Sequence, residues 1–358
     1  MRNLKKEFPV TSQYIHLNTA ASGLLSETVL DFRQEHDLDY LIMGSLLKDK
    51  QDTFMTKVRE GVSGFFNCEP GQLALVPNFS FGFNILLEGL PKTSKVLLLR
   101  DDYPSINWAV TSRDFEVVYA DIDANLEENI TAKVEKEKPD VLALSLVQYL
   151  SGIQIDLNFL KQLKNAHPEL LIVADGTQYC GRETFDFDAS GIDVLGASAY
   201  KWLNAGYGNG FFMFKEAVQD RVFPKTIGFN SVRGKYKQEE NTFIGKFEPG
   251  HQDTLAHGSV TAAIGLVKSI GMPAIEEQIN LLKTQAFEAF AERGLLADMV
   301  LKRKNHAPIF NIKGDQKLFN KLREQDIICS QRGEGIRVSF HYFNTEDDLM
   351  RLLKVIGH

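Results

Sequence analysis

Short apolar runs separated by charged, helix-length stretches are the main pattern along this chain. Three of these runs lie close together, at Leu171–Ala174, Val194–Ala197 and Gly210–Phe214. Apolar runs of this length, bounded by polar residues or glycine, are typical of buried strands. Similar runs come earlier, at residues 72–76, 95–100, 115–120 and 140–147. Strands that alternate with helical stretches predict an α/β fold built on a mostly parallel sheet.

Reactive side chains stand at the ends of two of these predicted strands. Asp175 follows the first run, and Ser198, Tyr200 and Lys201 follow the second. Open α/β sheets bind ligands at the carboxyl ends of their strands, so these side chains are expected to share a site. Pyridoxal phosphate (PLP) needs such a set, with a lysine for a Schiff base, a carboxylate for the pyridine nitrogen and donors for the phosphate. Lys201 and Asp175 are the candidates for the first two roles.

The motifs D-G-T-Q at 175–178 and S-A-Y-K-W-L at 198–203, followed by a glycine-rich turn, resemble class V aminotransferases of PLP fold type I. That family includes cysteine desulfurases, kynureninase and proteins like isopenicillin N epimerase. The resemblance implies a large domain, residues 14–250, with a mostly parallel sheet of the seven-stranded type. A small α+β domain would take residues 1–13 and 251–358. It also implies Lys201 and Asp175 as catalytic residues, and Gln178, Ser198 and Tyr200 as further cofactor contacts.

Two earlier segments are expected to hold other parts of PLP. The segment PNFSFGFNILLEGL, residues 77–90, reads as a turn that leads into a helix, and a helix N-terminus is a natural phosphate site. At the position of the family's Gly-Ala-Thr turn, this chain has Asn78, Phe79 and Ser80. Phe79 can offer only its backbone N–H, whereas Ser80 offers its N–H and its hydroxyl. The resemblance also makes Tyr103 the aromatic residue that packs against the cofactor ring.

The C-terminal segment GIRVSFHYFNTEDDLMRLLKVI resembles the family's signature for substrate binding. Arg337 within it corresponds to an arginine that grips the substrate carboxylate through both oxygens. A structural ion pair is the alternative role for Arg337. Gln148 and Asn18 are further candidates for substrate contact. His251 stands where the family has a threonine that reaches the phosphate of the neighbouring subunit, which implies a homodimer with shared active sites.

Composition and charge restrict the class of protein and its partners. The chain has 358 residues, 44% of them hydrophobic and 24% charged, which fits a soluble globular enzyme with a large core. A net charge of −7 argues against a nucleic-acid partner. The first residues lack the apolar centre of a signal peptide, and no run of about 18 apolar residues predicts a membrane span. Three unclustered cysteines predict neither disulfides nor a metal site, so a reduced, cytoplasmic protein is expected.

The reaction class stays open at this stage among transamination, side-chain elimination and epimerisation. A cysteine desulfurase would need a mobile loop with a nucleophilic cysteine before Arg337, but Cys329 lies in an apolar strand pattern. A non-catalytic PLP-binding module is a further alternative. The combination of Lys201, Asp175 and Arg337 argues against it, because binding alone needs no carboxylate grip. A dinucleotide site is excluded because the glycines at 206, 208 and 210 precede a strand rather than open a helix.

Overall fold

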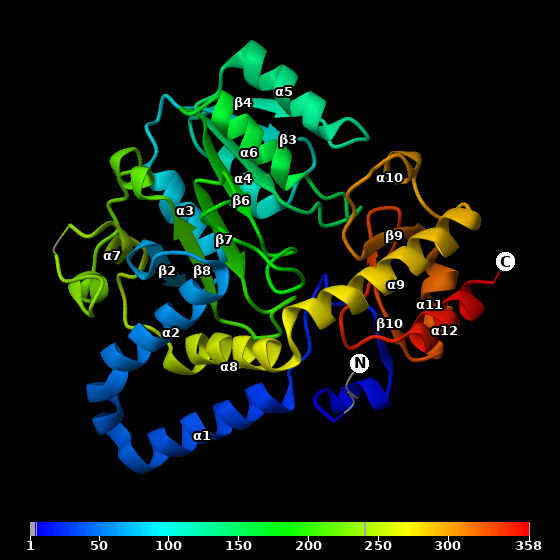
Figure 1. Cartoon of the computed structure of the whole chain (residues 1–358), viewed down its shortest axis with the longest axis horizontal. Helices are drawn as coiled ribbons and strands as arrows, with labels where there is room; N and C mark the ends of the chain where they lie inside the picture. The colour runs from blue at the N-terminus through cyan, green and yellow to red at the C-terminus, as the bar shows by residue number, and fades with distance from the viewer. Residues whose placement is uncertain (1–3, 5, 240, 358) are drawn as a thin grey trace.

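Seven short strands form the central sheet of the protein, in a computed structural model that describes residues 4, 6–239 and 241–357 (Figure 1). The strand order is β2-β8-β7-β6-β5-β3-β4. Strand β8 runs antiparallel to both of its neighbours, and the other pairings are parallel. The predicted α/β fold with a mostly parallel sheet is therefore confirmed. The strands are β2 Leu73–Val76, β3 Lys95–Leu99, β4 Glu116–Ala120, β5 Val141–Ser145, β6 Leu171–Asp175, β7 Val194–Ser198 and β8 Gly210–Phe214.

Both faces of this sheet are covered by helices, which explains why its strands are continuous apolar runs. In β3, Val96 and Leu98 belong to one buried cluster, whereas Leu97 and Leu99 belong to another. Because successive side chains of a strand point to opposite faces, one strand supplies both clusters. The first cluster includes residues of α3 Phe79–Gly89, α4 Pro104–Thr111 and α7 Phe243–Phe247. The second includes residues of α1 Glu27–Met43, α2 Gln51–Phe66, α5 Leu126–Glu137, α6 Leu157–Ala166 and α8 Thr254–Ile270.

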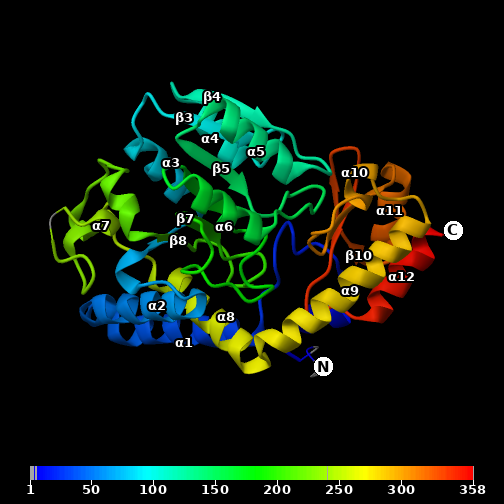
Figure 2. The same ribbon diagram turned by 45° about the horizontal axis from the view of Figure 1, so that its top comes forward.

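The C-terminal part of the chain forms a smaller α+β unit at one side of the molecule (Figures 1 and 2). Its sheet is antiparallel, in the order β11-β12-β9. A short parallel pair, β1 with β10, attaches the N-terminal segment to this unit. The strands are β1 Ile15–His16, β9 Ile309–Lys313, β10 Ile327–Ile328, β11 Ser330–Arg332 and β12 Gly335–Ser339. The helices are α9 Met272–Glu292, α10 Asp298–Leu301, α11 Gln316–Glu324 and α12 Glu346–Ile356.

Two local features bear on the predicted domain division, which stays a prediction. Helix α8 lies beside α1 and α2, under the central sheet, while α9 leads away to the C-terminal unit (Figure 2). Ile15 pairs with Ile327, so the first strand belongs to the same small sheet as β10.

Within the described residues, no single helix has the length and apolar character needed to cross a membrane. The pair α8 and α9 would meet the same test of length and composition together, with a bend of 81° between them.

Candidate functional site

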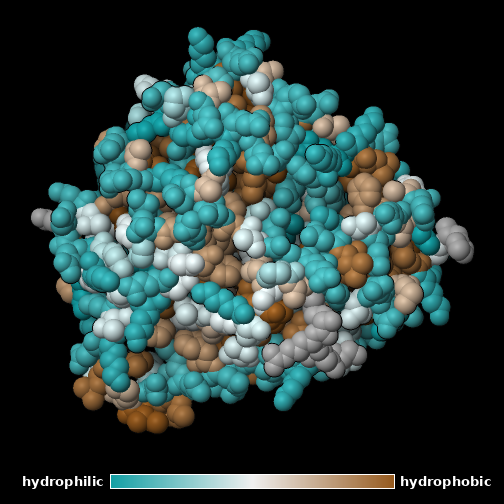
Figure 3. Space-filling view, viewed as in Figure 1, coloured by the Kyte–Doolittle hydropathy of each residue, from teal (hydrophilic) through white to brown (hydrophobic). Residues whose placement is uncertain are grey.

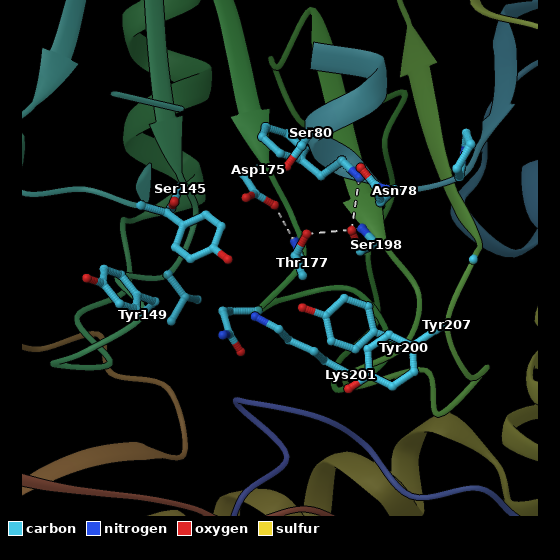
Figure 4. A pocket seen from close by; sticks show the side chains of 16 residues that line it. Asn78, Ser80, Ser145, Tyr149, Asp175, Thr177, Ser198, Tyr200, Lys201 and Tyr207 are labelled. Atoms are coloured by element: carbon cyan, nitrogen blue, oxygen red, sulfur yellow. Dashed lines mark hydrogen bonds between the residues drawn. The ribbon is translucent and has the colours of Figure 1, made fainter. Parts of the chain in front are cut away.

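The carboxyl ends of the central strands and the N-terminus of α3 surround a cavity of about 370 Å³ (Figure 4). Ser145, Asp175 and Ser198 are the last residues of β5, β6 and β7, and all three line this cavity. Parallel strands end at the same edge of a sheet, so the strand order itself brings these side chains together. The remaining lining residues come from the loops that follow the strands and from the first turn of α3: Pro77, Asn78, Phe79, Ser80, Tyr103, Val147, Tyr149, Thr177, Gln178, Tyr200, Lys201, Tyr207 and Gly208.

Asp175 and Lys201 are both buried in the wall of this cavity, each with only 6% of its surface exposed. Burial disfavours a charged carboxylate and raises the pKa of Asp175 to about 6, against hydrogen bonds from Thr177 and the charge of Lys201. Burial likewise disfavours a charged ammonium and lowers the pKa of Lys201 to about 8, against the charge of Asp175. A lysine with such a pKa is partly neutral near neutral pH, and the neutral amine is the nucleophilic form.

A chain of hydrogen bonds through Thr177 connects β6, β7 and α3. The Thr177 N–H donates to Asp175 Oδ1 over 2.8 Å, and Thr177 Oγ1 accepts from the Ser198 N–H over 3.0 Å. The Ser198 hydroxyl in turn accepts from the Phe79 N–H over 2.9 Å. Figure 4 shows this series running from the carboxylate to the start of the helix. The carboxylate and the helix N-terminus are therefore held in a fixed relation to each other.

The N-terminus of α3 can hold an anion at the edge of the cavity. Asn78 caps this helix, because its side chain accepts from the Phe81 N–H over 2.9 Å. The Phe79 N–H is bonded to Ser198 and the Phe81 N–H to Asn78. Ser80, at the second position of the helix, lies between them and lines the cavity. Its hydroxyl donates to the Ser105 hydroxyl over 2.8 Å. The positive end of the helix dipole is directed at the same place, which suits a phosphate.

Four tyrosines line the cavity, and two of them lie beside the Lys201 amine. The Lys201 nitrogen lies 5.6 Å from the ring centres of both Tyr103 and Tyr200. Tyr149 meets Tyr103 edge to face at 5.2 Å, and Tyr207 stacks on Tyr200 at 4.6 Å. The cavity can therefore enclose an aromatic ring between apolar faces, with the amine beside it.

Tyr103 is anchored by a buried carboxylate that sequence reasoning missed. Asp102 accepts from the Tyr103 N–H and the Ser145 N–H, each over 2.7 Å. Burial is the main influence on this group, and it raises the pKa of Asp102. The two bonds fix the start of α4 against the end of β5. Asp102 is an acid before a proline turn in the sequence, a pattern that gives no sign of this role.

Gln178 lines the cavity and also connects two loops. Its amide nitrogen donates to the Ala20 carbonyl over 2.8 Å, and its oxygen accepts from the Trp202 indole N–H over 2.7 Å. Through these bonds it holds the loop that carries Lys201 next to the N-terminal loop. Gln178 therefore supports the position of Lys201, whatever contact it also makes in the cavity.

Arg337 lies just outside the lining residues. Its guanidinium donates to the Tyr149 carbonyl over 2.8 Å, and Tyr149 itself lines the cavity. Only 3% of Arg337 is exposed, and its Nε has no hydrogen-bond partner among the described residues. Burial lowers the pKa of Arg337 to about 10, and the charge of this residue reaches Lys201, whose pKa it helps to lower. A buried arginine with an unsatisfied donor beside a cavity is suited to bind an anion.

Besides Arg337, three other predicted contacts do not line the cavity. The Gln148 side-chain oxygen accepts from the Leu150 and Ser151 N–H groups, so it closes its own turn. Asn18 accepts from the Ser330 hydroxyl over 2.6 Å, at the joint with the small sheet. His251 is exposed, and its ring stacks on Phe229 at 5.7 Å. The expected role of His251 concerns the site of a neighbouring subunit, so its place outside this cavity leaves that prediction open.

Thr177, Tyr149 and Tyr207 line the cavity although the sequence analysis gave them no role. Thr177 stands inside the D-G-T-Q motif, between two residues that received roles, so the motif was a usable signal for it. Tyr149 and Tyr207 come from loops 58 residues apart in sequence. Their aromatic character alone does not distinguish them from surface tyrosines.

Comparison with known proteins agrees with this geometry. The Aminotransferase class-V family model matches residues 15–352. The uncharacterized aminotransferase YcbU of Bacillus subtilis is 21% identical over 98% of this chain and 95% of its own length. The isopenicillin N epimerase of Amycolatopsis lactamdurans is 22% identical over 99% of this chain and 97% of its own length.

Among solved structures, the apo structure of a cysteine desulfurase from Thermococcus onnurineus superposes with a TM-score of 0.86. It is 19% identical and covers 99% of this chain and 98% of its own. At this identity the likeness establishes the fold, PLP fold type I, as the sequence predicts.

Proposed function

Because this chain belongs to the aminotransferase class-V family, whose members are PLP-dependent enzymes, we propose that it acts on an α-amino acid with Lys201 as the Schiff-base lysine. One observation carries the proposal. A buried amine of lowered pKa and a buried carboxylate lie at the ends of adjacent strands, beside a helix N-terminus and the faces of four tyrosines. These are the groups that PLP requires.

Each residue has a role that follows from its surroundings. When bound, PLP supplies an electron sink that stabilises negative charge at the substrate Cα. Lys201 would bind the cofactor aldehyde through its Nζ, and the same Nζ would be placed to accept a proton from the substrate Cα. Asp175 holds a proton on the pyridine nitrogen, since a buried carboxylate binds a proton or a cation strongly.

Ser80 and the N-terminus of α3 would hold the phosphate, and Tyr103 would offer its face to the cofactor ring. Arg337 binds the substrate carboxylate through its free N–H groups. Asp175 and the start of α3 are linked through Thr177 and Ser198. One hydrogen-bonded unit would therefore position both the group for the ring nitrogen and the group for the phosphate. Such preorganisation spares the enzyme the cost of ordering these groups at each turnover.

Within the family, we favour transamination over persulfide chemistry, with elimination and epimerisation as the alternatives. Cys329 has only 7% of its surface exposed, and burial raises the pKa of its thiol to about 11. A thiol with such a pKa is protonated near neutral pH and is a poor nucleophile. Strands β11 and β12 are joined by a turn of two residues, Gly333 and Glu334, which leaves no extended loop there to carry a cysteine.

We also propose a homodimer in a reducing, cytoplasmic setting. Cys68, Cys180 and Cys329 are all free thiols, as is usual for proteins of that compartment. Exposed apolar side chains at the end of α1 offer a surface for this dimer.

Borohydride reduction of the protein with PLP, followed by peptide mapping, tests the central assignment. We expect the cofactor label on Lys201 alone, and we expect Lys201→Ala to lose it while staying folded. Lys283→Ala is the matched control, because burial lowers the pKa of this lysine as well. A label on another lysine in the wild type would refute the assignment.

A further inference from the structure

The small sheet has one polar face and one apolar face. In β12, Ile336 and Val338 belong to the hydrophobic core, while Arg337 and Ser339 point to the other side. The Ser339 hydroxyl accepts from the Ala20 N–H over 3.0 Å, and Gln178 of the cavity wall binds the carbonyl of the same Ala20. The polar face of the small sheet is therefore directed toward the cavity side of the large sheet.

The register of the β11–β12 hairpin places a second arginine on that polar face. Arg337 stands opposite Ser330, and Arg332 stands opposite Gly335. Residues directly opposite each other in an antiparallel pair share a face, as do residues two apart in one strand. Arg332 and Arg337 are therefore diagonal neighbours on one face, at a spacing of roughly 7–8 Å between backbone positions.

Among the described residues, neither arginine forms an ion pair, although Glu334 lies in the turn that joins their strands. Other buried arginines of this protein do have carboxylate partners: Arg59 pairs with Glu248, Arg182 with Glu183 and Arg303 with Glu127. The charges of Arg332 and Arg337 both reach Lys201 in the cavity, because both lower the pKa of its amine. Buried Arg337 and its exposed neighbour Arg332 are therefore both without a carboxylate partner among the described residues.

We propose that Arg332 binds a second carboxylate of the substrate, so that the enzyme selects amino acids with an acidic side chain. This inference rests on the proposed function, in which Arg337 takes the α-carboxylate and α3 takes the phosphate. The α-carboxylate of the substrate occupies one guanidinium group, that of Arg337. Arg332 therefore remains available for a carboxylate at the end of the substrate side chain. Arg332 is exposed, which fits a place at the outer part of the site, where the end of the substrate side chain would lie.

The test compares acids with their amides in the holoenzyme. L-Aspartate and L-asparagine, and L-glutamate and L-glutamine, are titrated at fixed ionic strength and followed by cofactor absorbance. Calorimetry with glutarate and butyrate, which carry no amine, gives a second measurement independent of the chemistry at Lys201. The variants are Arg332→Gln, Arg332→Lys and Arg337→Lys. Arg351→Gln, on the exposed side of α12, is the control for loss of one positive charge.

We expect the wild type to bind at least one of the two acids about tenfold or more tightly than its amide, and glutarate more tightly than butyrate. Arg332→Gln should abolish this preference and leave the affinity for amides within about twofold. Arg332→Lys should keep part of the preference for acids. Arg337→Lys should weaken the binding of acids and of amides alike, and Arg351→Gln should change the binding of neither class.

A wild type without the preference, or an Arg332→Gln variant that retains it, would overturn the inference while the borohydride label on Lys201 still supported the proposed function. Conversely, absence of label at Lys201 would refute the proposed function. The calorimetric comparison of glutarate and butyrate would still test whether Arg332 binds a second carboxylate.

Discussion

At the scale of single residues, burial sets the protonation chemistry of the candidate site. The same loss of water raises the pKa of the Asp175 carboxyl and lowers that of the Lys201 amine. The two shifts bring two groups of ordinarily distant pKa values to within about two units of each other. A Lys201 pKa of about 8 lies close to neutral pH, so this amine can both lose and take up a proton there.

The pH dependence of cofactor attachment follows from the Lys201 pKa. Below about pH 8 the amine is mostly protonated and cannot attack the aldehyde, so the rate of covalent attachment to the cofactor-free protein should rise with pH and level off above about 8. An ordinary lysine would level off near 10.5. The measurement is the rate of absorbance change after PLP is added at a series of pH values.

Asp175→Asn provides the matched variant for this experiment. The negative charge of Asp175 raises the pKa of Lys201, so its removal should move the midpoint of the profile to lower pH. Asp188→Asn changes an exposed carboxylate on the segment between β6 and β7, and it should leave the midpoint of the profile unchanged. A midpoint near that of free lysine in the wild type would contradict the proposed state of Lys201.

At the scale of elements, α3 links the central sheet to the anion site. Its first turn is closed by the Asn78 side chain and by the Ser198 hydroxyl, which come from two different segments. The helix is short and largely buried, so its N-terminus cannot move without disturbing the core around Phe83 and Leu86. A phosphate bound there meets a rigid element.

Asn78→Ala separates the stability of this helix from its binding role. Loss of an N-cap side chain costs about 1 kcal/mol of unfolding free energy. Asp315→Ala removes the corresponding cap of α11, where Asp315 accepts from the Leu318 N–H over 2.8 Å. Both variants should lose similar stability in urea titrations, but only Asn78→Ala should bind PLP more weakly. Equal cofactor affinity in the two variants would count against a phosphate at α3.

At the scale of the whole molecule, one exposed apolar surface stands out at the end of α1. Leu41 and Ile42 have 81% and 73% of their surfaces exposed there. Leu38, Tyr40 and Leu46 are also exposed, and we call these five residues the α1 patch. Figure 3 shows brown apolar residues gathered at the lower left, where α1 turns toward α2 in Figure 1. Apolar patches of this kind are typical of interfaces.

If the α1 patch forms the proposed homodimer, Leu41→Asp should shift the protein toward the monomer. A carboxylate at the centre of an apolar interface loses its hydration without gaining a partner. The measurement is sedimentation velocity over a range of concentrations. Leu281→Asp, at an exposed leucine of α9 in the C-terminal unit, is the matched control and should stay dimeric. A monomeric wild type would contradict the homodimer, and an unchanged Leu41→Asp variant would place the interface elsewhere.

Local patterns in the sequence were enough to predict much of this molecule. The apolar runs at Leu171–Asp175 and Gly210–Phe214 are strands with nearly the bounds that the pattern gives, because buried strands must be continuously apolar. Thr345 and Asp348, a Thr and an acid three residues apart, form a capping box at the start of α12, as this local pattern predicts. The positions of Asp175 and Lys201 at strand ends follow from the same pattern, together with the rule that places sites there.

Tertiary structure alone decided which distant groups meet and which side chains face inward. Thr177 joins Ser198, 21 residues away, and Asp102 joins Ser145 across 43 residues. Gln148, a candidate from the resemblance, uses its side-chain oxygen within its own turn. The position of Arg332 and Arg337 on one face depends on the register of a hairpin, and a slip of one residue would move a side chain to the other face. The pKa values depend on burial, which is a property of the packed chain and not of any local stretch.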